Sequence, residues 1–468
     1  MTWAAPTGRP SRLSRRMDAV VAQELAGLDR LPRWSRLRRE TSALKDASAA
    51  MNAPTLATMT HSAPSSTSST SWRGVVVWAG AALVIGALNE YGLYVAMPAV
   101  RETFELPVNS IGWTLLVFLI ADAIVLIAAG KLGDRVGRAK VAVAGLALIA
   151  VGSLICAVAP SFSVILVGRV IEGIGVGALF SGLLAIIADA VPAESRGRAF
   201  GLWALIGAFA VFLSPVIGGA LAEYLSWRWI FVLNAVISLA ALAAARRYIS
   251  AAPPSRESAA AGRSSLLGST NYAAGTTVMA LIYATMALTG LLLVFFLTVV
   301  TGLGLTVTGL TIMAYAVWWL VLPPFTGRLA DRAGVRTPMI IGTCLGAIGF
   351  GVLILGAGSQ NMLIVSLGLC CVGIGVAFVI PAANAAAMGN VPPDIRGDAS
   401  GINMTARIVG SIAGLAVSII LLRSLDPGDI VAGAQTAWTV AFVLMLIALG
   451  VSAVGIKKGS SSPAQTDA

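Results

Sequence analysis

Charge is scarce in this sequence: only 11% of its 468 residues are Asp, Glu, Lys or Arg, while 57% are hydrophobic. Soluble globular proteins carry about 25% charged residues, so there are too few here to cover a soluble surface of this size. The shortage excludes a cytosolic multidomain enzyme and favours a membrane protein. A net charge of +11 would suggest a nucleic-acid partner in a soluble chain, so the positions of the basic residues must decide.

Histidine and cysteine are scarce as well. The only histidine is His61, and Cys156, Cys344, Cys370 and Cys371 lie inside apolar runs without a Cys-x-x-Cys spacing. We therefore expect neither a disulfide framework nor a Cys/His metal site, and interpret the cysteines as small apolar packing residues. Since the sequence also lacks a GxxxxGK[ST] phosphate loop and an HExxH motif, we expect no enzyme, no metal and no cofactor.

Long apolar segments are abundant. A helix needs about 20 mainly apolar residues to cross a bilayer, and twelve such segments follow residue 73, in two groups of six. The sequence thus predicts an all-α polytopic membrane protein, embedded in the lipid bilayer, with twelve transmembrane helices in two six-helix bundles. Pro323-Pro324 predicts a break at the end of the eighth span. The approximate bounds are 75–97, 111–130, 139–158, 163–188, 197–222, 227–249, 273–298, 309–327, 338–357, 362–388, 397–422 and 436–456.

The first 73 residues differ from all that follow. Residues 1–73 hold 11 of the 32 Lys and Arg residues and a Ser/Thr-rich tract, which predicts a disordered basic tail. Two alternatives stay open: a basic helix over residues 17–40 that lies on anionic lipid, or a later translation start at Met51 or Met59.

The other domain boundaries follow changes in composition. The two bundles are predicted at 74–249 and 273–456. A polar linker with two adjacent prolines separates them at 250–272, and a second polar tail occupies 457–468.

The basic residues predict the orientation in the membrane. If the N-terminus is cytoplasmic, 16 Lys and Arg residues after residue 73 fall in cytoplasmic segments and only three, Arg101, Arg228 and Arg423, in outer loops. This bias follows the positive-inside rule and predicts two cytoplasmic termini in the cell membrane. The positive charge is therefore a topology signal, and no nucleic-acid partner is expected.

The two halves of the chain repeat each other. Since each half has six spans, both copies cross the membrane in the same direction, which predicts two bundles related by a pseudo-twofold axis along the membrane normal, with a substrate path between them. Segments 173–176 and 191–201 recur at 373–376 and 391–401, and segment 130–137 recurs at 327–334.

The loop between the second and third predicted spans is rich in glycine and charge. Glycine lets helix ends approach closely and turn sharply, and a carboxylate there can accept hydrogen bonds from an arginine or a helix N-terminus. The loop resembles the signature loop of the major facilitator superfamily, and the resemblance extends over residues 74–456. It implies a conformational latch formed by Gly130, Gly133, Asp134, Arg135, Gly137 and Arg138, with Asp331 and Arg332 in the second copy.

Further elements resemble the drug/proton antiporter branch of that family. Residues 227–234 read WRWIFVLN, a run typical of the branch. In the first span Asn89 stands where the family has an aspartate, and in the fourth span Glu172 replaces the usual glutamine. The fifth span carries an antiporter-like motif in which serine replaces the first glycine, formed by Ser214, Pro215, Gly218 and Gly219.

Three carboxylates of the first half, Glu90, Asp122 and Glu172, are predicted near the middle of the membrane, with Arg169 as the buried base nearby. A charge at the bilayer centre costs roughly 2.5–3.5 kcal/mol on insertion scales and therefore usually faces a transport pathway. One arginine cannot compensate three carboxylates, so we expect at least one of them to bind and release a proton. The alternatives are a static Arg169–Glu172 ion pair, and exposure of Glu90 to water in the outer half of the membrane.

Aromatic, amide and thioether side chains in the spans are candidates for the wall of a substrate cavity. Such groups make an adaptable surface for varied ligands, although on spanning helices they also pack or lie at the lipid interface. Arg407 is either an attractor for an anionic substrate group or a structural cation. The candidates are Asn89, Tyr91, Tyr283, Met286, Tyr315, Trp318, Trp319, Asn384, Asn403 and Arg407.

These observations predict a secondary active transporter. The favoured function is proton-coupled efflux of amphipathic or drug-like small molecules by a monomer that rocks one bundle against the other. A proton-coupled or passive importer of a small metabolite is the alternative on the same scaffold. A non-transporting membrane sensor is a third hypothesis, which would leave the intramembrane carboxylates without a purpose.

Overall fold

The computed structural model describes residues 72–248, 269–389, 391–392, 395–422 and 426–456. The predicted basic tail lies outside the described residues except for its last two positions, and so do the alternatives proposed for it. Most of the linker 250–272, Arg423 and the tail 457–468 also lie outside them.

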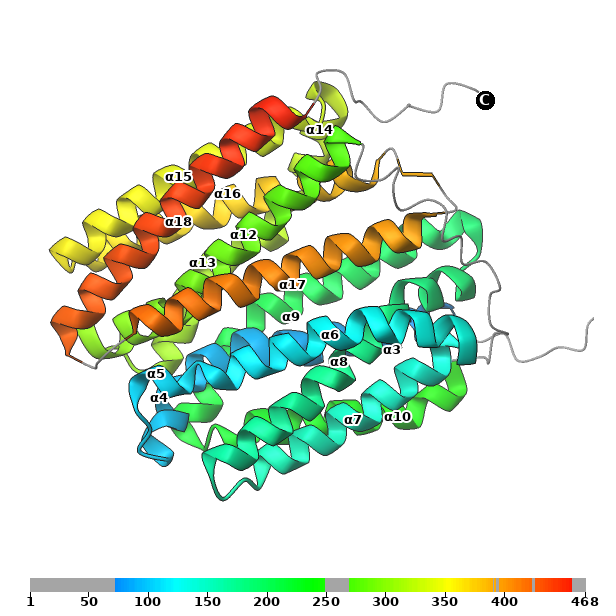
Figure 1. Ribbon diagram of the computed structural model, residues 1–468, viewed down its shortest axis with the longest axis horizontal. Helices are drawn as coiled ribbons and strands as arrows, with labels where there is room; N and C mark the ends of the chain where they lie inside the picture. Colours follow the sequence, from blue (N-terminus) through cyan, green and yellow to red (C-terminus); the bar gives the residue numbers. More distant parts are fainter. Residues whose placement is uncertain (1–71, 249–268, 390, 393–394, 423–425, 457–468) are drawn as a thin grey trace, which may run out of the picture. The chain divides into compact units, whose positions relative to one another are not determined.

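The N-terminal half consists of helices that cross the bundle in alternating directions (Figure 1). Its first span contains a five-residue π-helical turn, η2, between two α-helices. In chain order the elements are α3 (Trp72–Ala87), η2 (Leu88–Gly92), α4 (Leu93–Thr103), α5 (Val108–Ile111), α6 (Trp113–Val136), α7 (Arg138–Ala157), α8 (Phe162–Ala190), the 3₁₀ turn η3 (Ala193–Ser195), α9 (Arg196–Tyr224) and α10 (Arg228–Tyr248).

The C-terminal half repeats this arrangement. Its first span ends in a π-helical turn, η5, and its second is divided in two. The elements are α12 (Thr270–Phe295), η5 (Phe296–Val300), α13 (Leu305–Val321), α14 (Pro323–Ala333), α15 (Arg336–Ser359), α16 (Met362–Met388), α17 (Arg396–Leu421) and α18 (Pro427–Gly455).

Span number agrees with the sequence-based prediction, and the bounds differ by no more than about six residues except that the last helix begins at Pro427 rather than at 436. Within the described residues, eleven helical segments are long and apolar enough to cross a membrane, and the α13–α14 pair, bent by 41°, makes a twelfth. The bend falls at Pro323-Pro324, as predicted, because proline cannot donate the backbone hydrogen bond of a continuous helix. In lipid only such internally hydrogen-bonded segments are stable, so twelve apolar runs become twelve spans.

Packing within each half follows the repeat. In the first half α8 packs against α6 and α7, and in the second half α16 packs against their counterparts, the α13–α14 pair and α15. The most extensive contacts between the halves join α9 with α13 and α6 with α17, and smaller ones join α4 with α12 and α13. Small residues line these contacts, as expected where helices associate in lipid through close backbone approach.

The halves approach each other closely at one end of the molecule. We call the end that holds Gly137 and Gly334 the basic end. At the opposite end, a Cβ placed on Gly112 would lie 2.2 Å from Ile419 of the other half. Toward the basic end, a Cβ on Gly130, Gly201, Gly327 or Gly401 would meet no described atom within 4 Å. The closest of these approaches between the halves is therefore at the opposite end.

Candidate functional site

A buried arginine organises the N-terminal half. Arg169 of α8 is fully buried, and its Nη1 donates to Asn89 Oδ1 at 2.5 Å and to Glu172 Oε2 at 2.7 Å. Its Nε donates to the carbonyl oxygen of Thr114 at 3.0 Å, and its guanidinium carbon lies 4.1 Å from the centre of the Phe118 ring. Arg169 thus ties the fourth span to the first two.

Glu172 is held on both carboxylate oxygens. One oxygen accepts from Arg169 and the other accepts a short hydrogen bond from the hydroxyl of Ser153 on α7. A buried ion pair stabilises a protein only when further hydrogen bonds satisfy its remaining atoms, and this one has them. The geometry matches the static ion pair considered as an alternative above. Ser153 was not identified from the sequence, because no local motif marks it.

Glu90 and Asp122 have no comparable partners. Glu90 lies in the π-helical turn η2 and Asp122 is buried on α6, where its Oδ1 faces Gly177 of α8. Among the described residues, neither carboxylate has a hydrogen bond or an ion pair within 4 Å, although the two interact electrostatically. π-Helical turns occur frequently at functional sites, which agrees with the position of Glu90.

Arg407 supplies a second intramembrane cation near the acids, which corrects the expectation that Arg169 is the only base close to them. It lies on α17 of the C-terminal half and interacts electrostatically with Glu90. Its guanidinium stacks over the Tyr283 ring at 4.2 Å and donates to the Tyr283 hydroxyl, while its Nε has no partner among the described residues. Opposite charges from the two halves therefore interact across the boundary.

Aromatic rings from both halves meet beside these charges. Tyr91, next to Glu90 in the chain, makes an edge-on contact with Trp319 of α13 at 6.3 Å between ring centres. Trp319 makes a second edge-on contact with Tyr315 at 5.5 Å. Three of the predicted cavity residues thus form one aromatic cluster across the boundary between the halves.

The remaining cavity candidates lie in other surroundings. Asn403 donates to Asn384 at 3.0 Å, one turn of α17 nearer the basic end than Arg407. Met286 packs half-buried against the apolar core, and Trp318 lies against Gly373 of α16. Asn89 is fully buried against Arg169. Its role as a cavity residue stays a prediction.

The signature loop forms a tight turn at the basic end. Gly137, between α6 and α7, has a φ of 103°, which only glycine adopts readily. Arg138 donates to Asp134 at 3.0 Å, with both side chains about one third exposed, and Arg135 is exposed. In the second copy Gly334 has a φ of 75°, and Asp331 and Arg332 are exposed.

The antiporter-like motif brings α9 against two neighbours. A Cβ on Gly218 would lie 2.1 Å from the carbonyl oxygen of Gly92, and one on Gly219 would lie 2.4 Å from that of Leu305 in the other half. Pro215 makes an equally close backbone contact with Gly309. The motif therefore determines how closely α9 approaches the first and eighth spans.

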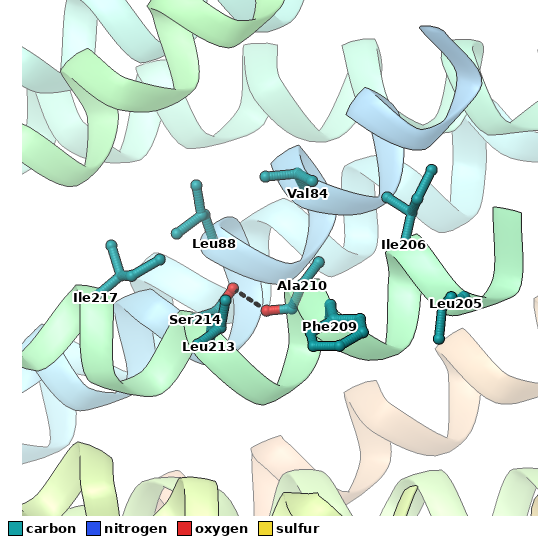
Figure 2. Close-up of a pocket in the computed structure, with 9 residues that line it drawn as sticks. All are labelled: Val84, Leu88, Leu205, Ile206, Phe209, Ala210, Leu213, Ser214 and Ile217. Atoms are coloured by element: carbon teal, nitrogen blue, oxygen red, sulfur yellow. Dashed lines mark hydrogen bonds between the residues drawn. The ribbon is translucent and has the colours of Figure 1, made fainter. Parts of the chain in front are cut away.

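An apolar pocket of about 320 Å³ lies between α3 and α9 (Figure 2). Its one polar side chain, Ser214, donates its hydroxyl to the Ala210 carbonyl at 2.6 Å, so the wall offers no unpaired polar group. Leu88 on its wall directly precedes Asn89, which places the pocket beside η2. The lining residues are Val84, Leu88, Leu205, Ile206, Phe209, Ala210, Leu213, Ser214 and Ile217.

Twelve spans in two repeated halves, with ionisable groups inside the spans, define a membrane protein of the secondary-transporter type. A model of the Major Facilitator Superfamily matches residues 79–415, and the chain belongs to this superfamily. The bilayer in which such a multi-pass protein works is the cell membrane.

Its relatives include drug-resistance proteins. The chain is 28% identical over 383 residues to Multidrug resistance protein Stp of Mycobacterium tuberculosis, across 69% of this chain and 71% of that one. It is 26% identical over 435 residues to the Tetracenomycin C resistance and export protein of Streptomyces glaucescens, across 79% and 80%. The crystal structure of a D-xylose-proton symporter shares the fold, with a TM-score of 0.69 at 16% identity, covering 83% of this chain and 99% of that one.

Proposed function

We propose that this transporter exports amphipathic or drug-like molecules in exchange for protons. The observation that carries the proposal is the state of Glu90 and Asp122, two intramembrane carboxylates without hydrogen-bond partners among the described residues. Unpaired carboxylates are costly in a membrane and are commonly retained for proton or substrate movement. The relatives named for drug resistance and export support efflux rather than uptake.

The coupling step uses charges from both halves. When Glu90 is ionised it attracts Arg407 across the boundary, and when it takes up a proton this attraction is lost. Protonation therefore changes the free energy of interaction between the two halves. The substrate occupies the region of Tyr91 and Trp319, where its polar group and the proton compete for interaction with the carboxylates.

Other predicted residues receive supporting roles. Glu172, held by Arg169 and Ser153, is assigned to structure rather than proton exchange. Asp134 and Arg138 form the latch at the basic end, which we assign to the cytoplasmic face together with both termini. Because both walls of the path belong to one chain, we propose that the monomer transports.

Import is the second candidate, since a sugar-proton symporter shares the fold. A fold alone does not determine direction or substrate. The export proposal rests on the antiporter-like motif of α9 and on the relatives, both of which can be tested by direct transport measurements.

Transport by inverted membrane vesicles tests the proposal. Vesicles that carry the wild-type protein should take up compounds from a panel of cationic, neutral and anionic toxins when a proton gradient is imposed. Glu90→Gln and Asp122→Asn should each lower this uptake at least about tenfold, since neither amide binds a proton at neutral pH. Glu102→Gln, which removes an exposed carboxylate from the same span, is the matched control. Normal uptake by both variants would refute the coupling assignment, and proton-dependent accumulation in intact cells would favour import.

A further inference from the structure

At the end opposite the basic end, helix α13 begins without a side-chain cap of its own, as α6 and α8 also do. The N-terminus of a helix leaves backbone N–H groups unpaired, and a side chain just before the helix usually accepts from one of them. Two neighbouring helices follow this rule: Asn361 accepts from Leu363 at the start of α16, and Asp426 accepts from Gly428 at the start of α18. Helix α13 instead begins after Gly304, which has no side chain to offer.

The missing cap of α13 comes from the other half of the protein. Glu223, in the last turn of α9, accepts a hydrogen bond of 2.6 Å from the backbone N–H of Thr306. Its second oxygen lies against Gly304, 2.6 Å from where a Cβ would stand. A carboxylate at this position also interacts favourably with the positive end of the helix dipole. A side chain at 304 would displace the carboxylate from this position.

This contact exists only while the two halves are together at this end. We propose that Glu223 is a gating residue that caps α13 from the opposite half and stabilises the state in which this end is closed. The inference rests on the alternating-access part of the proposed function but does not depend on proton coupling. Opening this end separates α9 from α13 and breaks this hydrogen bond, which leaves the N-terminus of α13 without a cap. The cap therefore makes opening less favourable.

A cap within one helix and a cap between the halves differ in their effect. Removing the cap that Asn361 provides destabilises α16 in every state and leaves the ratio of states unchanged. Removing the cap that Glu223 provides destabilises only the closed state. Because Glu223 is exposed and its interaction is screened by water, the expected shift is roughly two- to fivefold in the ratio of open to closed molecules.

Distances between spin labels at the opposite end test the proposal. Labels replace Val158 and Ser359, exposed residues that end helices of different halves, in the full chain without its native cysteines, reconstituted in lipid nanodiscs. Glu223→Ala should enlarge the long-distance population roughly two- to fivefold, and Glu223→Gln, which keeps an acceptor oxygen but no charge, should enlarge it less. Asn361→Ala should leave the distribution as in the parent chain.

A rescue experiment separates gating from helix stability. In the Glu223→Ala chain, Gly304→Ser gives α13 a cap of its own, and the missing carboxylate leaves room for the new side chain. Thermal stability should recover while the population shift persists. An unchanged distance distribution in Glu223→Ala, an equal shift in Asn361→Ala, or reversal of the shift by Gly304→Ser would overturn the proposal. None of these readouts depends on whether protons drive transport.

Discussion

The two halves use the same backbone contacts around different chemistry. In the N-terminal half, a Cβ on Gly152 would lie 2.7 Å from Cγ of Glu172, and in the C-terminal half, a Cβ on Gly349 would lie 2.7 Å from Cγ2 of Val372. The repeat pairs these positions with each other, and it pairs Arg169 with Leu369. Glycine contacts therefore maintain the shared scaffold, whereas the buried charges are an addition to one half.

The largest expected effect comes from making the first half resemble the second at one position only. Arg169→Leu leaves Glu172 buried with Ser153 as its remaining partner, and breaking a buried ion pair in this way costs about 3–5 kcal/mol. We expect most of the protein to be lost from the folded, monodisperse fraction in detergent. Thermal unfolding followed by size-exclusion chromatography measures the loss.

The double change Arg169→Leu with Glu172→Val completes the resemblance and should recover more than half of that stability, since well-packed apolar residues can replace a buried ion pair at little cost. A double variant as unstable as the single one would show that the charges are required for folding.

A smaller loss of stability, caused by replacing glycines at the helix contacts, should be equal in both halves. A Cβ on Gly175 would lie 2.7 Å from the Gly145 carbonyl oxygen, and one on Gly375 would lie 2.6 Å from that of Gly342. Gly175→Ala and Gly375→Ala should each destabilise the protein by about 1–3 kcal/mol, because backbone must move to admit the methyl group. Gly201→Ala, which meets no described atom within 4 Å, should be neutral or slightly stabilising. Melting temperatures provide the comparison, and unequal losses would contradict the shared scaffold.

Local signals in the sequence predicted the scaffold well. Apolar runs predicted the twelve spans, the adjacent prolines predicted the bend between α13 and α14, and the repeated glycines mark equivalent contacts. The spans and the bend depend on residues close together in the chain, where length, hydropathy and backbone restrictions act directly.

The arrangement of the charges could not be predicted in the same way. Asn89 and Arg169 are 80 residues apart, and nothing local shows that their side chains meet. Arg407 interacts with Glu90 across the boundary between the halves, and Glu223 likewise accepts a hydrogen bond from Thr306 of the other half, so neither contact follows from neighbouring residues in the chain. The π-helical turn η2 lies where Gly218 of α9 closely approaches Gly92. This approach is a tertiary contact, and no sequence pattern marks it.

The smallest expected effect compares the two copies of the signature loop. Asp134 accepts from Arg138 four residues later, whereas the residue four positions after Asp331 is Val335, so the second copy cannot form the same pair. An exposed pair of this kind is worth about 0.2–1 kcal/mol, which corresponds to a change of up to about fivefold in rate.

Asp134→Asn should therefore slow transport up to about fivefold with little change in the apparent affinity for substrate. Asp331→Asn should leave the rate unchanged, and initial rates over a range of substrate concentrations, measured in the same vesicles, distinguish the two. Equal slowing by both variants would mean that the latch depends on the charge of each loop and not on the ion pair that only the first copy can form.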